Sequence, residues 1–195
     1  MTLRQRLCRI LETQGYSGED TLKLRFYDEF SWVVGLGDPR RSKTPIPLWL
    51  GVRHEGVQAL IADLMQLPDD GFDVVTGTNL GYVLGQGFRF EQEPTTAQEL
   101  ADRLADGERI LSAYCRLDAL PAIFDEIRGT TLPLFHFQLV AIHMLLGDQQ
   151  GVDKWLAVAE RVNCKHPGPL TDQFRRFEAR VRERLPEFVG PGTAE

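Results

Sequence analysis

The segment that decides the fold class is residues 22–34, which read LKLRFYDEFSWVV. Apolar side chains occupy every second position on both sides of the polar pair at 28 and 29: Leu22, Leu24, Phe26, Phe30, Trp32 and Val34. Alternation with a period of two is typical of strands, and two such runs joined by a short polar pair form a hairpin. The segment therefore predicts two adjacent strands.

The elements around this hairpin have clear periodicities. Residues 3–11 carry apolar side chains at helical spacing, and Gly15 follows as a stop signal. Residues 35–47 contain three prolines and a basic cluster, which indicates an exposed loop. The apolar run at 48–52 predicts a third strand, and residues 55–67 predict a helix with one apolar stripe.

Residues 72–90 carry alternating apolar positions on either side of the polar segment 76–79. This pattern predicts a second pair of strands with the polar segment as their turn, and Gly85 and Gly87 as a bulge.

The chain becomes helical after Pro94. Thr96 and Glu99 have the spacing of a capping box, so a helix is expected to begin near residue 97. Proline and glycine punctuation predicts further helices at 108–119, 122–128, 134–147, 152–163 and 171–185.

Strands followed by helices, without regular alternation, predict an α+β fold: an antiparallel or mixed sheet from the N-terminal half packed with helices, and a helical C-terminal half. We expect one domain over residues 1–188, strand-rich in 1–93 and helical in 94–188, with a frayed tail at 189–195. The segment 133–162 predicts a single helical hairpin that turns near Gly147.

The charge of the chain is uneven. The net charge is −6, and residues 91–130 alone carry four basic and nine acidic side chains. Such a protein repels phosphate backbones, so we expect a basic protein partner and no nucleic acid. A solvated helix face would also explain the acidity. The candidate partner-binding residues are Asp69, Asp70, Asp73, Glu91, Glu93, Glu99 and Asp102.

Membrane insertion and export have no sequence signal. The longest apolar stretch, 137–146, is far shorter than the ~18 to 20 residues that a bilayer crossing needs. Three widely spaced cysteines, Cys8, Cys115 and Cys164, are expected to be reduced packing residues of a cytoplasmic protein. One of them acting as a nucleophile is the alternative.

No motif for a cofactor or a metal is present. His136 and His143 are seven residues apart on a predicted helix, about 10 Å along its axis, whereas metal-binding pairs prefer a spacing of four. We expect no metal, no cofactor and a non-catalytic protein. An enzyme with a dispersed site of His54, Asp73, His136 and His143 remains an alternative, as does an adaptor or chaperone.

The helix predicted at 171–185 has an apolar face surrounded by arginines. Interspersed glutamates permit salt bridges along the helix, so core packing with a charged exterior is the favoured interpretation. Binding to a membrane surface or to nucleic acid is the alternative.

The order of several short segments resembles small bacterial immunity proteins of polymorphic toxin systems. These segments are Gly15-Tyr16, Phe26-Tyr27, Trp32-Val33-Val34, the run 48–52 and the turn 145–148. The resemblance implies a cytoplasmic protein that binds and blocks a cognate toxin without catalysis of its own. It carries over no binding residues, because such proteins recognise toxins through variable surfaces.

Overall fold

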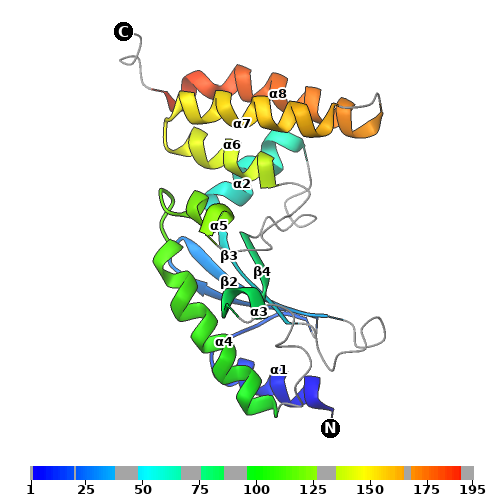
Figure 1. Ribbon diagram of the computed structural model, residues 1–195, viewed down its shortest axis with the longest axis vertical. Coiled ribbons are helices and arrows are strands. Elements are labelled where there is room, and N and C mark those ends of the chain that lie inside the picture. The colour runs from blue at the N-terminus through cyan, green and yellow to red at the C-terminus, as the bar shows by residue number, and fades with distance from the viewer. Residues whose placement is uncertain are drawn as a thin grey trace. The chain divides into compact units, whose positions relative to one another are not determined.

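The computed structural model describes residues 2–19, 21–37, 48–66, 76–85, 96–126, 135–164 and 168–189. The chain forms two compact units (Figure 1). Unit 1 comprises Met1–His54 and Val75–Thr131, and unit 2 comprises Glu55–Val74 and Leu132–Glu195. None of the helices in the described ranges combines the length and apolar character needed to cross a membrane.

Unit 1 is built on a four-stranded antiparallel sheet in the order β1-β2-β3-β4. Its strands are β1 (Leu22–Tyr27), β2 (Phe30–Leu36), β3 (Leu48–His54) and β4 (Thr76–Asn79). The predicted hairpin and third strand are confirmed, and so is the α+β fold class, with the sheet in the N-terminal half and helices in the C-terminal half.

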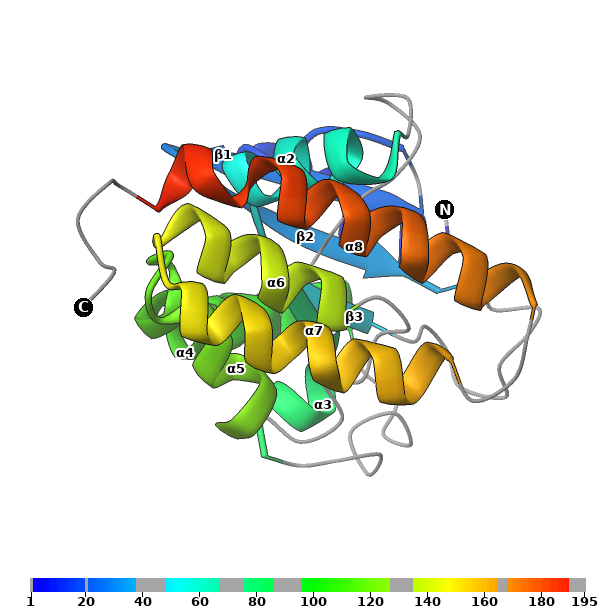
Figure 2. The ribbon, with the colours of Figure 1, turned by 90° about the horizontal axis from the view of Figure 1, so that it is seen from above.

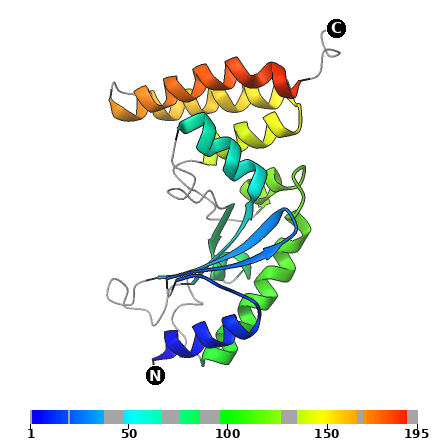
Figure 3. The ribbon, with the colours of Figure 1, turned by 180° about the vertical axis from the view of Figure 1, so that it is seen from behind.

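Two helices cover one face of this sheet, α1 (Leu3–Thr13) and α4 (Ala97–Leu111) (Figure 3). The register places Val34 beside Leu50 and Trp32 beside Val52, so these four buried side chains share a face. Leu50 packs closely against α4. Burial of this alternating row of apolar side chains beneath amphipathic helices forms the core of unit 1.

The prediction for residues 76–90 is wrong in its described part. Thr76–Asn79, expected to be a turn, is strand β4, and α3 (Leu80–Val83) follows where a strand was expected. Leu80 and Val83 are both buried, and their spacing of three places them on one side of a helical turn. Gly85 adopts a positive φ of 71° in the turn that follows, and the remaining residues to 90 lie outside the described ranges.

The helical region after Pro94 is also organised differently from the prediction. The capping box at Thr96 and Glu99 is present, but α4 continues to Leu111 instead of ending before a separate helix at 108. A short 3-10 turn, η2 (Ser112–Tyr114), follows it, and then α5 (Leu120–Glu126). Gly107 lies inside α4. Its lack of a side chain allows the helix to pack closely against Leu50 of β3.

Unit 2 consists of α2 (Glu55–Met65), α6 (Phe135–Leu145), α7 (Gln149–Asn163) and α8 (Pro169–Phe188). Helices α6, α7 and α8 lie side by side (Figures 1 and 2). Phe137 of α6 packs against Phe174 and Phe177 of α8, with ring centroids 6.5 and 4.4 Å apart. These contacts confirm the predicted apolar face of the last helix.

The predicted hairpin of α6 and α7 is confirmed, with its turn at residues 146–148. Gly147 has a left-handed φ of 67°, and its N–H donates to the carbonyl of Met144 at 2.9 Å. Asp148 then caps α7 by accepting a hydrogen bond from the N–H of Gly151. Helix α8 begins at Pro169, two residues before its predicted start, because proline suits the first position of a helix.

Candidate functional site

Only part of the predicted acidic surface can be placed. Asp69, Asp70 and Asp73 lie outside the described residues, as do Glu91 and Glu93. Glu99 and Asp102 lie on the solvent-exposed side of α4 in unit 1.

Local hydrogen bonds fix both carboxylates on the helix surface. Glu99 accepts a hydrogen bond from the backbone N–H of Thr96 at 2.7 Å, while the Thr96 hydroxyl accepts one from the N–H of Glu99 at 3.2 Å. Asp102 accepts from the side-chain amide of Gln98 at 2.9 Å. None of these hydrogen bonds involves a cation, and neither carboxylate forms an ion pair with a described residue.

The two residues belong to a longer stripe on α4. Asp106 continues it and forms an ion pair with Arg109 at 2.8 Å. The spacing of three and then four residues places Glu99, Asp102 and Asp106 on one helix face, and we call these three residues the acidic stripe. Ile110, one turn further along this face, is 41% exposed. An acidic row that ends in an exposed apolar side chain suits contact with another protein.

The end of α4 is joined to the sheet by a polar cluster. The hydroxyl of Tyr16 donates to Glu108, and Arg25 of β1 forms an ion pair with the same carboxylate. The Arg25 guanidinium lies 4.8 Å from the centre of the Tyr16 ring. Burial, and then the charge of Glu108, raise the pKa of Tyr16. The cluster therefore orients α4 while Tyr16 stays a neutral hydrogen-bond donor.

Two of the three cysteines, Cys8 and Cys115, lie in surroundings that do not favour a nucleophile. All three are free, and Cys8 is buried. Burial, with a smaller contribution from Glu108, raises the pKa of Cys115 to about 11. A reactive cysteine needs a lowered pKa, because the thiolate is the nucleophile. The geometry around Cys115 therefore favours a packing role.

Two of the candidate histidines are packed imidazoles. His54, at the end of β3, is 8% exposed and makes an edge-to-face contact with Phe30 at 4.8 Å. His136 is 5% exposed and stacks on Trp155 at 6.3 Å. Burial lowers the pKa of His136, so its neutral form is favoured. His54 belongs to unit 1 and His136 to unit 2, while Asp73 lies outside the described residues.

His143 has a carboxylate partner that the sequence analysis missed. Its Nδ1 lies 2.8 Å from Oδ2 of Asp148, and the other oxygen of Asp148 accepts from the N–H of Gly151 at 3.0 Å. The Gly151 hydrogen bond and His143 hold the pKa of Asp148 below its usual value. A carboxylate that orients an imidazole is also the arrangement of a general base. Here the same carboxylate caps α7, which gives the pair a structural role.

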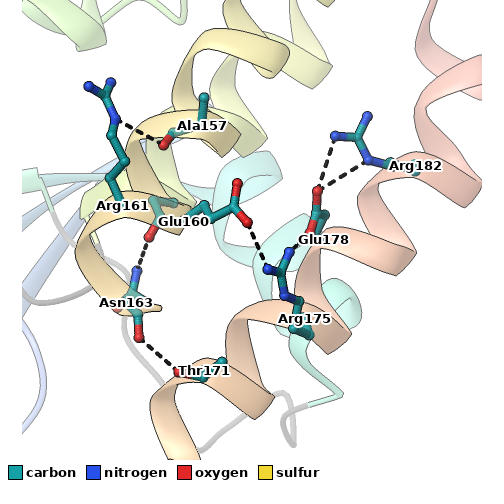
Figure 4. A network of polar contacts seen from close by, with 9 residues as sticks. Ala157, Glu160, Arg161, Asn163, Thr171, Arg175, Glu178 and Arg182 are labelled. Atoms are coloured by element: carbon teal, nitrogen blue, oxygen red, sulfur yellow. Dashed lines mark hydrogen bonds and ion pairs between the residues drawn. The ribbon is translucent and has the colours of Figure 1, made fainter. Parts of the chain in front are cut away.

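Three of the five arginines of α8 form ion pairs, namely Arg175, Arg182 and Arg184. Figure 4 shows the contacts of the first two. Arg175 lies between Glu160 of α7, at 2.7 Å, and Glu178 of its own helix, at 2.9 Å. Arg182 binds Glu178 from the other side at 3.1 Å. These contacts neutralise much of the basic charge, as the spacing of glutamates predicted. They favour a charged exterior over a surface for phosphates or lipid headgroups.

Across the described ranges, no group of three or more histidine, cysteine, aspartate or glutamate side chains has an arrangement suited to a metal ion. Comparisons with family models, with curated proteins and with solved structures find no match for the chain. The acidic stripe of α4 is thus the candidate site that the geometry itself supplies.

Proposed function

We propose that the chain is a non-catalytic cytoplasmic protein of the immunity type, which binds and blocks a basic protein toxin. The observation that supports it is the acidic stripe of α4. Glu99, Asp102 and Asp106 project from one exposed face of a helix whose opposite face is packed in the core of unit 1. The three free thiols are consistent with a reducing compartment.

The rigidity of α4 supports this role. The helix is capped at Thr96 and joined to the sheet through Glu108 near its other end, so its outer face is held in a fixed orientation. Aligned charges on a fixed element steer an oppositely charged protein toward a defined contact and raise its association rate. A basic toxin is a partner with that complementary charge.

An enzyme with a dispersed histidine and aspartate site is the alternative. His143 and Asp148 are its best-placed pair, but Asp148 already caps α7 and His136 is packed against Trp155. A metal or nucleotide bound in stoichiometric amount to the purified protein would favour this alternative.

The test uses variants that remove charge and keep every hydrogen bond of α4. Glu99→Gln retains the capping box, because glutamine also serves at that position. Asp102→Asn and Asp106→Asn retain an acceptor oxygen for Gln98 and Arg109. The association rate of the triple variant with the purified product of the adjacent gene is measured at two salt concentrations. We expect a rate about tenfold lower at low salt.

A second triple variant, Glu19→Gln with Asp172→Asn and Glu183→Gln, is the matched control. It changes the net charge equally through three exposed side chains elsewhere on the chain. We expect it to bind with nearly the wild-type rate. Equal association rates for the two triple variants would show that the acidic stripe does not guide the partner. If the wild-type chain forms no complex with the product of the adjacent gene, that protein is rejected as the toxin that the chain binds.

A further inference from the structure

The tip of the β1–β2 hairpin exposes two neighbouring aromatic side chains. Phe26 is 60% exposed and Tyr27 is 72% exposed, more than any other aromatic side chain whose burial the structure describes. Successive residues of a strand point to opposite faces of the sheet, so the tip carries one aromatic group on each side. Aromatic residues are enriched at protein interfaces, where their burial contributes much of the binding energy.

The open edge of β1 is too short to recruit an extended peptide as an added strand. Ser17 already pairs with Leu24, with two backbone hydrogen bonds of 2.7 and 2.8 Å. Peptide groups alternate in direction along a strand, so Phe26 is the one residue beyond Leu24 whose N–H and C=O point to that edge. Recognition at the tip must therefore use side chains.

The turn itself is acidic. Asp28 and Glu29 connect the two strands, and Glu29 is 75% exposed. Oε2 of Glu29 lies 3.7 Å from Nε2 of His54, whose imidazole is charged only when protonated. Arg25 is engaged by Glu108, and the Arg53 guanidinium lies 5.9 Å from the centre of the Phe26 ring. The tip thus combines two exposed carboxylates with an exposed Tyr27 ring.

The backbone at Asp28 suits a tight turn. Its φ is +55°, a left-handed conformation that aspartate adopts more readily than most other residues with a side chain. Asp28 therefore shapes the hairpin turn and also places an exposed carboxylate next to two exposed aromatic rings.

We propose that this hairpin tip (residues 26–29) is a contact surface for lysine and arginine side chains of a basic protein partner. The carboxylates of Asp28 and Glu29 pair with the cations, and the face of Tyr27 receives one by a cation–π contact. The proposal rests on the proposed function for the identity of the partner. It adds a second contact surface to unit 1, in addition to the acidic stripe.

The test titrates the full-length, isotope-labelled chain with a short blocked peptide of alternating lysine and arginine, followed by backbone amide chemical shifts. We expect saturable shifts at residues 26–29, whether or not the acidic stripe of α4 also responds. A peptide of alternating aspartate and glutamate should produce none. Tyr27→Ala, and separately Asp28→Asn with Glu29→Gln, should each weaken the binding about fivefold, because each removes one class of contact.

Leu170→Ala is the control variant, because Leu170 is a large apolar side chain with 62% exposure in unit 2. It should leave the peptide affinity unchanged. Unperturbed amide shifts outside the hairpin show that each variant is folded. Shifts confined to α4 would overturn the proposal for the tip while leaving the proposed function intact. Shifts at the tip that follow protein concentration without peptide would assign the surface to a second copy of the chain and also overturn it.

Discussion

Gly151 lies in the first turn of α7, directly against the pair formed by His143 and Asp148. A methyl group on its Cα would collide with Nδ1 of His143 and Oδ2 of Asp148. In Gly151→Ala, overpacking should cost about 1–3 kcal/mol, while the higher helix propensity of alanine returns at most about 1 kcal/mol. We therefore expect the free energy of unfolding to fall by a net amount of about 1–2 kcal/mol. Urea denaturation of the two proteins measures the difference.

His143→Ala supplies the control. Removal of the imidazole takes away the closest of the two clashes and releases the Asp148 carboxylate from its partner, so Gly151→Ala should cost clearly less in a protein that already carries His143→Ala. The double-mutant cycle then gives a coupling energy of roughly 1 kcal/mol or more, as expected for residues in contact. A destabilisation of equal size in both backgrounds would mean that the imidazole is not what excludes a side chain at position 151.

Individual residues differed in how readily their roles could be predicted. The capping box of Thr96 and Glu99 was predictable because both partners lie within one local motif. The pair of His143 and Asp148 was not, because its partners are joined across a turn whose geometry depends on Gly147 adopting a positive φ. The useful signal was Asp148 itself, an N-cap residue directly after a helix-ending glycine.

Helix α4 owes its position on the sheet to a glycine in its interior. A Cβ at Gly107 would lie 2.7 Å from the side chains of both Leu50 and Leu80. We expect Gly107→Ala to push α4 away from β3 and to lower the free energy of unfolding by about 1–3 kcal/mol. The displacement should also weaken the contact of Glu108 with Arg25, which amide shifts near Arg25 would report. An alanine variant as stable as the wild type would contradict this close packing.

The same glycine explains an error at the level of elements. The predicted start of a separate helix at residue 108 comes directly after Gly107, and a glycine inside a helical pattern does weaken the expectation of a continuous helix. The structure instead uses it for close approach between a helix and a sheet, which depends on Leu50, more than fifty residues away in sequence. Strands β1 to β3 were predictable because their side-chain alternation is local, whereas β4 has little apolar pattern and is defined by its pairing with β3.

At the scale of the whole molecule, packing groups the helices differently from their order along the chain. Helix α2 follows β3 directly, yet it contacts α6 and α8, and all three belong to unit 2. The segment from Val75 to Thr131 returns to unit 1 in between. Periodicity shows that α2 has an apolar stripe but not which helix covers it. The single domain expected over residues 1–188 stays a prediction, which an unfolding experiment can decide.

This interrupted path of the chain suggests that the units unfold together. When unit 1 is unfolded, α2 can pack on α6 only by closing a flexible loop of about seventy residues, at an entropic cost on the order of 3–4 kcal/mol. When unit 1 is folded, most of that segment is already ordered, so the entropic cost of closing the loop is no longer added. Unit 2 should therefore lose much of its stability when unit 1 unfolds, whatever the arrangement of the two units.

Trp155 of α7 reports on unit 2 when Trp32 and Trp49, both in unit 1, are replaced by phenylalanine. In this background we expect Leu50→Ala, a truncation in the core of unit 1, to remove about 3 kcal/mol of stability. The urea midpoint reported by Trp155 fluorescence should fall together with the midpoint from circular dichroism. The reciprocal truncation in unit 2, Leu139→Ala, should shift both signals in the same way. A Trp155 transition that stays in place when Leu50 is truncated would instead establish two independently folding domains, because loop closure would then contribute nothing to the stability of unit 2.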